Sequence, residues 1–563
     1  MSELLTAAQM KAIEATAIAS GAVTGLELME RAGAGVVAAV LEEWPELAVS
    51  PQRAVVLCGP GNNGGDGFVV ARLLAGRGWD VRVLAASAPD KMPPDASASA
   101  LKWRAIGSVE RLTEQNLRSG TSNDLYVDAI FGAGLSRPPE GEIADILTHI
   151  GGRNGDNAYY TPRLVAVDVP SVLCLDSGRS MLSADGYLPR ARLTVTFDSL
   201  KVGHVIAGGP ELCGRIAVVD IGVEPWRNME RPRRTSVGWS GIWKRARLGL
   251  VGPVQRGQIF ATLRPGAIQC ESLGKSGWVE PQNTHKYSFG HALIVSGDHG
   301  HAGAARMAAR AALRIGAGLV TVASPLAAMA ENAARLDAVM LKLLADAAGL
   351  AEVLADARIN ALCLGPGMGL DAAAAELVRI ALETSRLRLK AGAARGLRLV
   401  LDADALTLIA RDAGLFGLLH EGCVLTPHAG EFARLFPDIA AKLAAPAVTG
   451  PAYSKVDATR EAAARAGCVV LYKGADTVIA APDGRCSINA AVYERSAPWL
   501  ATAGSGDVLA GFITGLLARG FELMQAAETA AWLHVECARS FGPGLIAEDL
   551  AEELPKVFRA LGV

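Results

Sequence analysis

With 563 residues, the chain is longer than one hydrophobic core usually serves, so we expect two large domains. Half of its residues are hydrophobic, 5% are aromatic and 62 are glycine, which is typical of α/β enzymes and excludes disordered or fibrous classes. Its 55 basic and 57 acidic residues nearly cancel, so global charge attracts it neither to nucleic acid nor to an anionic membrane. Small-molecule chemistry is the function class that remains.

The cysteines and the first residues indicate where the protein works. The nine cysteines are scattered, odd in number and without a C-x-x-C pair, which favours a reducing compartment and no structural zinc. The first residues have no basic segment, and no apolar run reaches the roughly 20 residues that a membrane span needs. We therefore expect a cytoplasmic protein with no membrane or nucleic-acid partner.

Residues 4–44 come first and predict helices, because their apolar side chains recur at helical spacing. Short β-branched runs then alternate with helical stretches rich in Ala and Leu, which predicts parallel strands covered by helices. The expected strands are residues 54–58, 81–86, 125–131, 164–170, 193–197 and 216–222.

The alternation stops near Gly222, and residues 225–279 are expected to form a linker or boundary segment. A second series follows, with helices expected at residues 303–315 and 507–519. Its expected strands are residues 291–297, 318–325, 361–367, 397–406, 422–428 and 468–474. The fold class is therefore α/β, with two unlike three-layer αβα domains over residues 1–224 and 280–563.

The first candidate site follows the strand at residues 54–58, where GPGNNGGDG predicts a glycine-dense turn and then a helix. Such a turn lets backbone N–H groups approach a phosphate, although tight strand-to-helix turns need glycines anyway. Asn62, Asn63 and Asp66 favour a ligand site, and Asp128 and Asp168 end two further strands. A single strand-end aspartate is often a helix cap, but the carboxyl ends of parallel strands converge on one crevice.

These motifs resemble the NAD(P)H-hydrate epimerase family over about residues 1–225: ELMERAG (27–33), NNGGDG (62–67), DAIFGAG (128–134), DVPS (168–171) and the segment at Lys201. The resemblance implies a Rossmann-like domain that binds hydrated NADH or NADPH and a potassium ion. The residues implied to contact the hydrated cofactor are Asn62, Asn63, Gly64, Gly65, Asp66, Gly132, Ala133, Gly134, Leu135, Ser136, Arg137, Pro138 and Asp168. Those implied to bind potassium are Asn63, Asp128 and Ser171, and hard cations favour such oxygen ligands.

Epimerisation at the hydroxyl-bearing C6 of the reduced ring needs proton transfers that open and re-form the hemiaminal. A strand-end carboxylate is suitably placed for them, so Asp168 is the candidate base. One departure from the family is Val172, which follows Ser171 where a glycine usually stands. If the site needs the backbone freedom of glycine, this difference weakens the epimerase.

The second candidate site is ATAGSGDVLAGFITGLLARG (501–520), a small-residue turn that leads directly into an apolar-periodic helix. The free amides of Gly504, Ser505 and Gly506 and the positive helix end would face an anion. Asp507 is either a helix cap or a general base beside a phosphoryl-accepting hydroxyl. A kinase-like site needs both the amides and the carboxylate.

A second resemblance covers about residues 280–563, through the segments 285–305, 316–325, 365–369, 402–406, 426–432, 473–477 and 503–511. They resemble the nucleotide-dependent NAD(P)H-hydrate dehydratases of the ribokinase-like superfamily. The resemblance implies Mg²⁺ with ADP or ATP, bound by Lys473, Gly474, Ala475, Asp476, Thr477, Gly504, Ser505 and Gly506. It also implies that Ala304, Gly367, His428 and the catalytic Asp507 contact the hydrated cofactor.

Together the resemblances imply metabolite repair by a bifunctional isomerase and lyase. Phosphorylation turns the C6 hydroxyl of the S form into a good leaving group, and elimination restores the reduced cofactor. The expected partners are hydrated NADH or NADPH, an adenine nucleotide and further copies of the chain in a homo-oligomer. The alternative is a ribokinase-like small-molecule kinase with a non-catalytic N-terminal binding domain, which would release a stable phosphorylated product.

Overall fold

The computed structural model describes residues 2–119, 124–153, 163–182, 187–227, 259–261, 273–275, 285–391 and 396–563. The contacts divide the chain into two compact units, called here the N-terminal and the C-terminal unit. The N-terminal unit comprises Glu3–Thr235 and Ala445–Lys455, and the C-terminal unit comprises Met1–Ser2, Ser236–Ala444 and Val456–Val563. Most of the expected linker, residues 225–279, lies outside the described residues.

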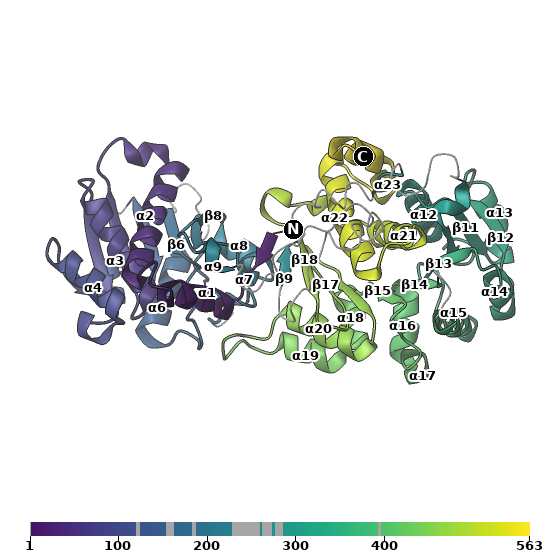
Figure 1. Ribbon diagram of the computed structural model, residues 1–563, viewed down its shortest axis with the longest axis horizontal. Coiled ribbons are helices and arrows are strands. Elements are labelled where there is room, and N and C mark those ends of the chain that lie inside the picture. Colours follow the sequence, from purple (N-terminus) through teal and green to yellow (C-terminus); the bar gives the residue numbers. More distant parts are fainter. Residues whose placement is uncertain are drawn as a thin grey trace. The chain divides into compact units, whose positions relative to one another are not determined.

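The N-terminal unit contains a seven-stranded sheet with the strand order β4-β3-β2-β5-β6-β7-β8 (Figure 1). All neighbouring strands are parallel, as the alternation predicted. The strands are β2 (Arg53–Cys58), β3 (Asp80–Ala85), β4 (Val109–Arg111), β5 (Leu125–Ala129), β6 (Arg163–Val167), β7 (Leu193–Phe197) and β8 (Arg215–Val219). The helices are α1 (Ala7–Ala19), α2 (Gly25–Glu43), α3 (Asn62–Ala75), α4 (Pro94–Arg104), α5 (Glu114–Arg118), α6 (Gly141–Arg153), α7 (Val202–Val205), α8 (Gly209–Cys213) and α9 (Glu224–Arg227).

The apolar runs of this sheet are buried on both faces, because successive side chains of a strand point in opposite directions. In β2, Ala54 and Val56 belong to a core cluster with residues of α2, α3 and α4. Val55 and Leu57 belong to a second cluster with residues of α5, α6 and α8. Two such clusters on opposite faces make the three-layer αβα arrangement.

The C-terminal unit contains a sheet in which the order β18-β17-β16-β15-β14-β13-β10-β11-β12 runs across most of its width. It is parallel from β16 to β12, whereas β17 is antiparallel to both β16 and β18. The strands are β10 (His291–Val295), β11 (Leu319–Ser324), β12 (Met340–Leu343), β13 (Ile359–Leu364), β14 (Arg398–Leu401), β15 (Cys423–Leu425), β16 (Val469–Tyr472), β17 (Asp476–Ala480) and β18 (Cys486–Ala490), with β9 (Ile259–Ala261) parallel to β18. The first strand of the chain is β1 (Ser2–Leu4).

Helices cover this second sheet as well (Figure 1). One large core cluster joins the strands to α12, α21, α22 and α23, and α21 is buried from Val508 to Ala518. The helices are α12 (Gly303–Arg314), α13 (Leu326–Ala333), α14 (Ala347–Leu354), α15 (Ala372–Lys390), α16 (Ala403–Arg411), α17 (Ala413–Phe416), α18 (Ala429–Leu435), α19 (Pro437–Ala444), α20 (Lys455–Ala466), α21 (Ser505–Ala518), α22 (Leu523–Phe541) and α23 (Ala547–Leu561). The predicted fold class of two α/β domains is confirmed.

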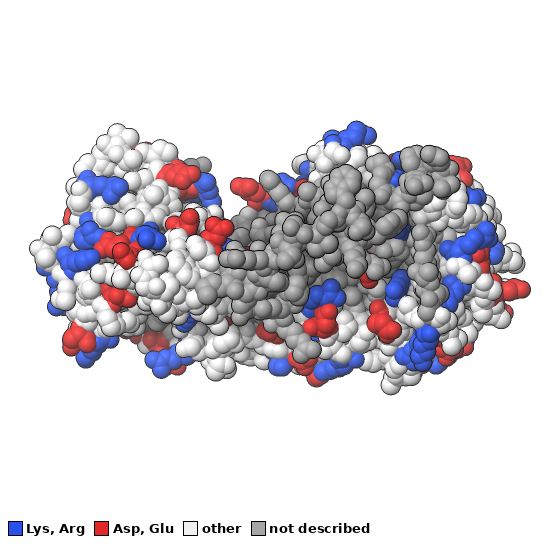
Figure 2. Space-filling model, in the orientation of Figure 1, with Lys and Arg blue, Asp and Glu red and all other residues white. Residues whose placement is uncertain are grey.

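The described surface carries both signs of charge. On the face drawn in Figure 2, Lys and Arg side chains are interspersed with Asp and Glu side chains. None of the described helices combines the length and the apolar sequence needed to cross a membrane.

Candidate functional sites

The glycine-rich motif of the N-terminal unit begins α3 itself, whereas the sequence predicted a turn before the helix. Asn62 is the first helical residue, after the N-cap residue Gly61, so the glycines lie within the first two turns. A Cβ atom built at Gly64 would lie 2.1 Å from the backbone oxygen of Gly59. A Cβ at Gly65 would lie 2.6 Å from the side chain of Met29. The glycines therefore let α3 pack directly on its surroundings.

We expect Gly64→Ala to lower the free energy of unfolding of the N-terminal unit by about 1–3 kcal/mol, because backbone atoms must move to admit the methyl group. Thermal or urea unfolding measures this effect. Gly61→Ala is the matched control, since a Cβ built at Gly61 meets nothing within 4 Å. Equal stability of the two variants would contradict the packing argument.

Asp168 lies at the centre of the N-terminal site, directly after β6. Its backbone is left-handed, with φ 65°, a conformation that non-glycine residues rarely adopt and that is frequent at functional sites. Its carboxylate accepts hydrogen bonds from Thr196 Oγ1 at 2.9 Å, Lys201 Nζ at 3.1 Å and the amide of Ala133 at 3.2 Å. Burial raises the pKa of this carboxyl, but Lys201 and His204 outweigh burial and hold it below its ordinary value. Asp168 is therefore ionised at neutral pH.

Lys201 is the cation that holds Asp168 in this state. It is 1% exposed, and its ammonium also donates to Thr196 Oγ1 at 2.7 Å and to the backbone oxygen of Phe197 at 2.9 Å. His204 Nε2 lies 2.9 Å from the backbone oxygen of Asp168. Burial lowers the pKa of His204 to about 4, so it stays neutral.

Asp128 and Ser171 form a second polar contact at the strand ends. Ser171 Oγ donates to Asp128 Oδ1 at 2.5 Å, and the Ser171 amide donates to Asp128 Oδ2 at 2.9 Å. Asp128 is 1% exposed, and burial raises the pKa of its carboxyl although hydrogen bonds from Ser171 and Ile130 lower it. The Nδ2 atom of Asn63 is buried without a hydrogen-bond partner. A buried carboxylate, a hydroxyl and an amide oxygen are ligands that suit a hard cation.

The loop Gly132–Pro138 follows β5 and reaches Asp168 at one end. A Cβ atom built at Gly132 would lie 2.8 Å from Asn63 Oδ1 and 3.4 Å from Asp168 Oδ2, so the three residues meet at this point. At the other end, the backbone oxygen of Ser136 accepts a hydrogen bond from the Gly450 amide at 2.9 Å. The rest of the loop lies between or beside these two contacts: Gly134, Leu135, Arg137 and Pro138. Leu135 packs in a small apolar cluster with Cys174, Met181, Ala447 and Ala452.

Val172 does not occupy a backbone conformation that requires glycine, because it is absent from the described residues with positive φ. Its side chain is fully buried in a cluster with Val169 and Leu173. The position is therefore filled by packing, and a reduced epimerase activity caused by Val172 has no backbone basis.

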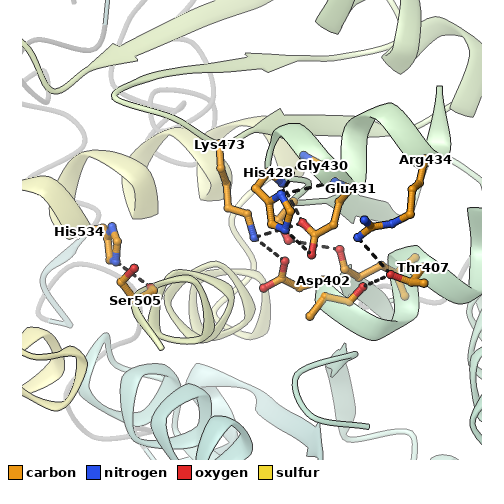
Figure 3. Close-up of polar contacts among 12 residues, drawn as sticks. Asp402, Thr407, His428, Gly430, Glu431, Arg434, Lys473, Ser505 and His534 are labelled. Atoms are coloured by element: carbon orange, nitrogen blue, oxygen red, sulfur yellow. Dashed lines mark hydrogen bonds and ion pairs between the residues drawn. The ribbon is translucent and has the colours of Figure 1, made fainter. Parts of the chain in front are cut away.

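In the C-terminal unit, the carboxylates of Asp402 and Glu431 lie beside Lys473 (Figure 3). Its ammonium lies 2.7 Å from Asp402 Oδ1 and 3.7 Å from Glu431 Oε2. Asp402 follows β14 and is 1% exposed, and Glu431 belongs to the first turn of α18. Burial lowers the pKa of Lys473, but Asp402 and Glu431 outweigh burial and raise it. Lys473 is therefore a fixed positive charge.

Asp507, in the first turn of α21, is the third carboxylate of this group. A Cβ atom built at the adjacent Gly506 would lie 3.5 Å from Lys473 Nζ and 3.9 Å from Asp402 Oδ2. Burial and Asp402 raise the pKa of Asp507 to about 6, although Lys473 lowers it. A half-buried carboxyl whose pKa lies near neutrality, in the first turn of a helix, can accept a proton from a bound hydroxyl.

The turn before α21 is held from two sides. Gly504 is the N-cap residue with a left-handed backbone, φ 87°, which favours glycine. Ser505 Oγ donates to the backbone oxygen of Leu500 at 2.9 Å, and His534 Nε2 lies 2.8 Å from the backbone oxygen of Ser505 (Figure 3). Burial lowers the pKa of His534 to about 4, so the neutral ring donates this hydrogen bond.

The other predicted residues lie in loops and turns of the same unit. His428 is the N-cap residue of α18, and its Nδ1 accepts a hydrogen bond from the Gly430 amide at 3.0 Å. This histidine therefore has a structural role as a helix cap. Its side chain is 56% exposed, and its Nε2 lies 3.4 Å from Glu431 Oε1. Asp476 and Thr477 are the first two residues of β17. The Thr477 hydroxyl donates to the backbone oxygen of Gly474 at 2.7 Å and accepts from the Gly474 amide at 3.2 Å, and Ala475 lies in the turn between them. Ala304 lies in the first turn of α12, and Gly367 has a left-handed backbone, φ 66°, beside His301.

The sequence interpretation missed four residues that the structure adds to the two sites: Glu14, Lys201 as an ion-pair partner, Asp402 and Glu431. Asp402 carried the same signal as Asp128 and Asp168, an aspartate directly after a buried strand. Glu431 is the partner of His428 in a capping box, which is a sequence pattern for a helix start. Lys201 stood in a segment that carried the resemblance, although no role was assigned to it, and Glu14 gave no local signal.

Comparisons with known proteins match both units. The NAD(P)H-hydrate dehydratase family matches residues 292–556, and the family described as YjeF-related protein N-terminus matches residues 25–203. The bifunctional NAD(P)H-hydrate repair enzyme Nnr of Moorella thermoacetica is 34% identical over 99% of this chain and 97% of its own. That of Salinibacter ruber is 34% identical over 98% of this chain and 96% of its own. A solved ADP/ATP-dependent NAD(P)H-hydrate dehydratase from Bacillus subtilis is 25% identical, covers 50% of this chain and 94% of that chain, and has a TM-score of 0.39.

Proposed function

Because the chain belongs to the family of bifunctional NAD(P)H-hydrate repair enzymes, we propose how its two sites divide the repair. The N-terminal unit epimerises the R and S hydrates of NADH and NADPH. The C-terminal unit dehydrates the S hydrate at the expense of ADP or ATP. The observation that carries the proposal is the meeting of Lys473, Asp402 and Asp507 at the start of α21.

In the C-terminal site, Asp507 accepts the proton of the C6 hydroxyl while the hydroxyl oxygen attacks the terminal phosphoryl group, whose bond to the nucleotide breaks and releases AMP from ADP or ADP from ATP. The amides from Gly504 to Gly506 and the Lys473 ammonium stabilise the charge of the migrating group. The C6–O bond then breaks, phosphate leaves, and a proton is lost from the neighbouring ring carbon. The residues from Lys473 to Thr477 hold the nucleotide, and Ala304, Gly367 and His428 line the place of the hydrated ring.

Magnesium bound with the nucleotide supplies a positive charge that neutralises phosphate oxygens. Mg²⁺ is usually held by one or two carboxylates together with substrate phosphates, and Asp402 and Glu431 beside Lys473 offer this donor set. In the N-terminal site, Asn63, Asp128 and Ser171 would hold potassium. The buried Asp128 carboxyl supports this assignment, because burial raises its pKa and a cation would offset that penalty.

In the N-terminal site, the ionised Asp168 removes the proton of the C6 hydroxyl, which opens the hemiaminal. The amides of α3 and the residues from Asn62 to Asp66 hold the cofactor phosphates and ribose, and the loop Gly132–Pro138 closes over the ring. Because the epimerase converts the R hydrate into the S hydrate, a dehydratase that accepts only the S form can consume both.

The test incubates purified protein with mixed-epimer hydrate, ADP or ATP, Mg²⁺ and K⁺ and follows the recovery of the absorbance of the reduced cofactor. We expect full recovery and release of inorganic phosphate. A stable phosphorylated product would instead support the small-molecule kinase alternative. That alternative is not favoured, because relatives that match nearly the whole chain are named as repair enzymes. The cytoplasmic location and the homo-oligomeric state stay predictions.

We expect the rate of dehydration to fall as the pH drops through about 6, because the pKa of Asp507 is raised to about 6 and a general base must be unprotonated. Asp402→Asn removes a negative neighbour that raises this pKa and frees Lys473, which lowers it. Both changes move the acid limb of the pH profile to lower pH. Rates of the two proteins at saturating substrate between pH 5 and 8 measure the shift, and an unmoved limb would show that another group titrates.

A further inference from the structure

We propose that Glu14, on α1, is the second acid–base group of the epimerase site and works opposite Asp168. The inference rests on the proposed epimerase function of the N-terminal unit. It assigns a role to a helix that lies outside the sequence motifs, and it follows from where that helix is anchored.

The start of α1 is fixed beside Lys201. Leu5 forms a parallel bridge with Lys201, and its amide donates to the backbone oxygen of Leu200 at 3.1 Å. The next contact is the Ala7 amide, which donates to Asp176 Oδ1 at 2.6 Å. The helix therefore begins next to the lysine that holds the Asp168 carboxylate.

One face of α1 is turned to the site. Lys11 Nζ lies 4.0 Å from a Cβ atom built at Gly134, in the loop that follows β5. Glu14 is three residues further along, and residues three apart share a helix face. Glu14 is partly buried and lies within electrostatic reach of Asp168, and of Asp66 on α3. Carboxyl groups from α1, α3 and the end of β6 therefore influence one another electrostatically.

The two carboxyl groups differ in charge state, which suits opposite roles. Burial, with Asp168 and Asp198, raises the pKa of Glu14 to about 7, although Lys201 and Lys11 lower it. The pKa of Asp168 is below its ordinary value for the reasons given above. At neutral pH Asp168 is a carboxylate, whereas Glu14 is able to carry a proton.

The step balances without any further reactant. The Asp168 carboxylate takes the proton of the C6 hydroxyl, the C6–N1 bond breaks to leave an aldehyde at C6, and Glu14 gives its proton to N1. After rotation about the C5–C6 bond, the Glu14 carboxylate takes the N1 proton back as N1 attacks the other face of the aldehyde. Asp168 then returns its proton to the oxygen, which gives the second epimer.

The experiment measures conversion of the purified R hydrate into the S hydrate by the full chain without nucleotide, so the dehydratase is silent. We expect Glu14→Gln to lower kcat about 100-fold with little change in KM, which is within the usual range for a lost acid–base group. The fall of wild-type kcat above pH 7, where Glu14 loses its proton, should disappear. Glu14→Asp should restore part of the rate. Glu42→Gln, at an exposed position of α2, is the matched control and should behave as wild type.

The outcomes separate the two proposals. Wild-type protein that fails to interconvert the epimers would overturn the proposed epimerase. Active wild-type protein with an unaffected Glu14→Gln variant, in rate and in pH profile, would overturn the role of Glu14 alone. Dehydration of the S hydrate with ADP by Glu14→Gln at the wild-type rate shows that the variant is folded, and a circular dichroism melting curve checks the N-terminal unit.

Discussion

Asp507→Asn is expected to lower the rate of nucleotide-dependent dehydration by about 10³-fold while epimerisation continues at the wild-type rate. Asparagine keeps the size of the side chain but cannot accept the hydroxyl proton. Because burial raises the pKa of Asp507 to about 6, the ionised form is penalised in the folded state. Removing the charge should therefore leave the melting temperature unchanged or raise it.

This combination separates a general base from a helix cap. Loss of a capping residue would lower stability by about 1 kcal/mol and would leave chemistry largely intact. The N-cap position of α21 is occupied by Gly504, which already argues against a cap at Asp507. The measurement is the initial rate of absorbance recovery with S hydrate and ADP, together with thermal unfolding. A variant that keeps the wild-type rate would overturn the dehydratase mechanism.

Asp168→Asn is expected to abolish epimerisation and to destabilise the N-terminal unit by about 3–5 kcal/mol, because the buried Lys201 ammonium loses its carboxylate. In mixed-epimer hydrate with ADP, the S form should be consumed normally. The R form should then disappear only at the spontaneous rate of interconversion. Chromatographic separation of the two epimers during the reaction measures both rates.

The double variant Asp168→Asn with Lys201→Met separates the two effects. Replacing a buried ion pair by neutral groups is often harmless to stability, so the double variant should melt closer to wild type than the single variant does. Its epimerase should stay inactive, because no base remains. An active double variant would contradict the assignment of Asp168, and a double variant as unstable as the single one would contradict the role given to the ion pair.

Both sheets could be predicted from the sequence because their strands are buried on both faces. Runs such as Ala54–Cys58 supply both core clusters, and this pattern leaves little room for another structure. The strands that gave a weaker signal are short or partly exposed. β12, with Met340 51% exposed and Leu343 50% exposed, lies at an edge and lacks a continuous apolar run.

Residues of the two sites could be predicted where a polar side chain or a small-residue turn lies at the end of a strand or at the start of a helix. Asp128 and Asp168 were found in this way, and the amides before α21 were found from the small residues of the turn. Glu14 could not be found, because its place depends on the docking of α1 beside Lys201, which is far along the chain. The start of α3 was placed too late, because glycines usually indicate a turn and here they admit close packing within the helix.

The segment Ala445–Lys455 has a practical consequence for anyone who truncates the protein. An expression clone that stops at Thr235 omits the Gly450 amide that bonds Ser136, and it omits Ala452, whose amide donates to the Cys174 sulfur at 3.3 Å. The Cys174 thiol, 2% exposed in the intact chain, would then meet solvent and alkylating reagents. A fragment intended for measurements of native epimerase kinetics should carry these eleven residues on a tether. Without them, the loop Gly132–Pro138 lacks the hydrogen bond from the Gly450 amide to Ser136.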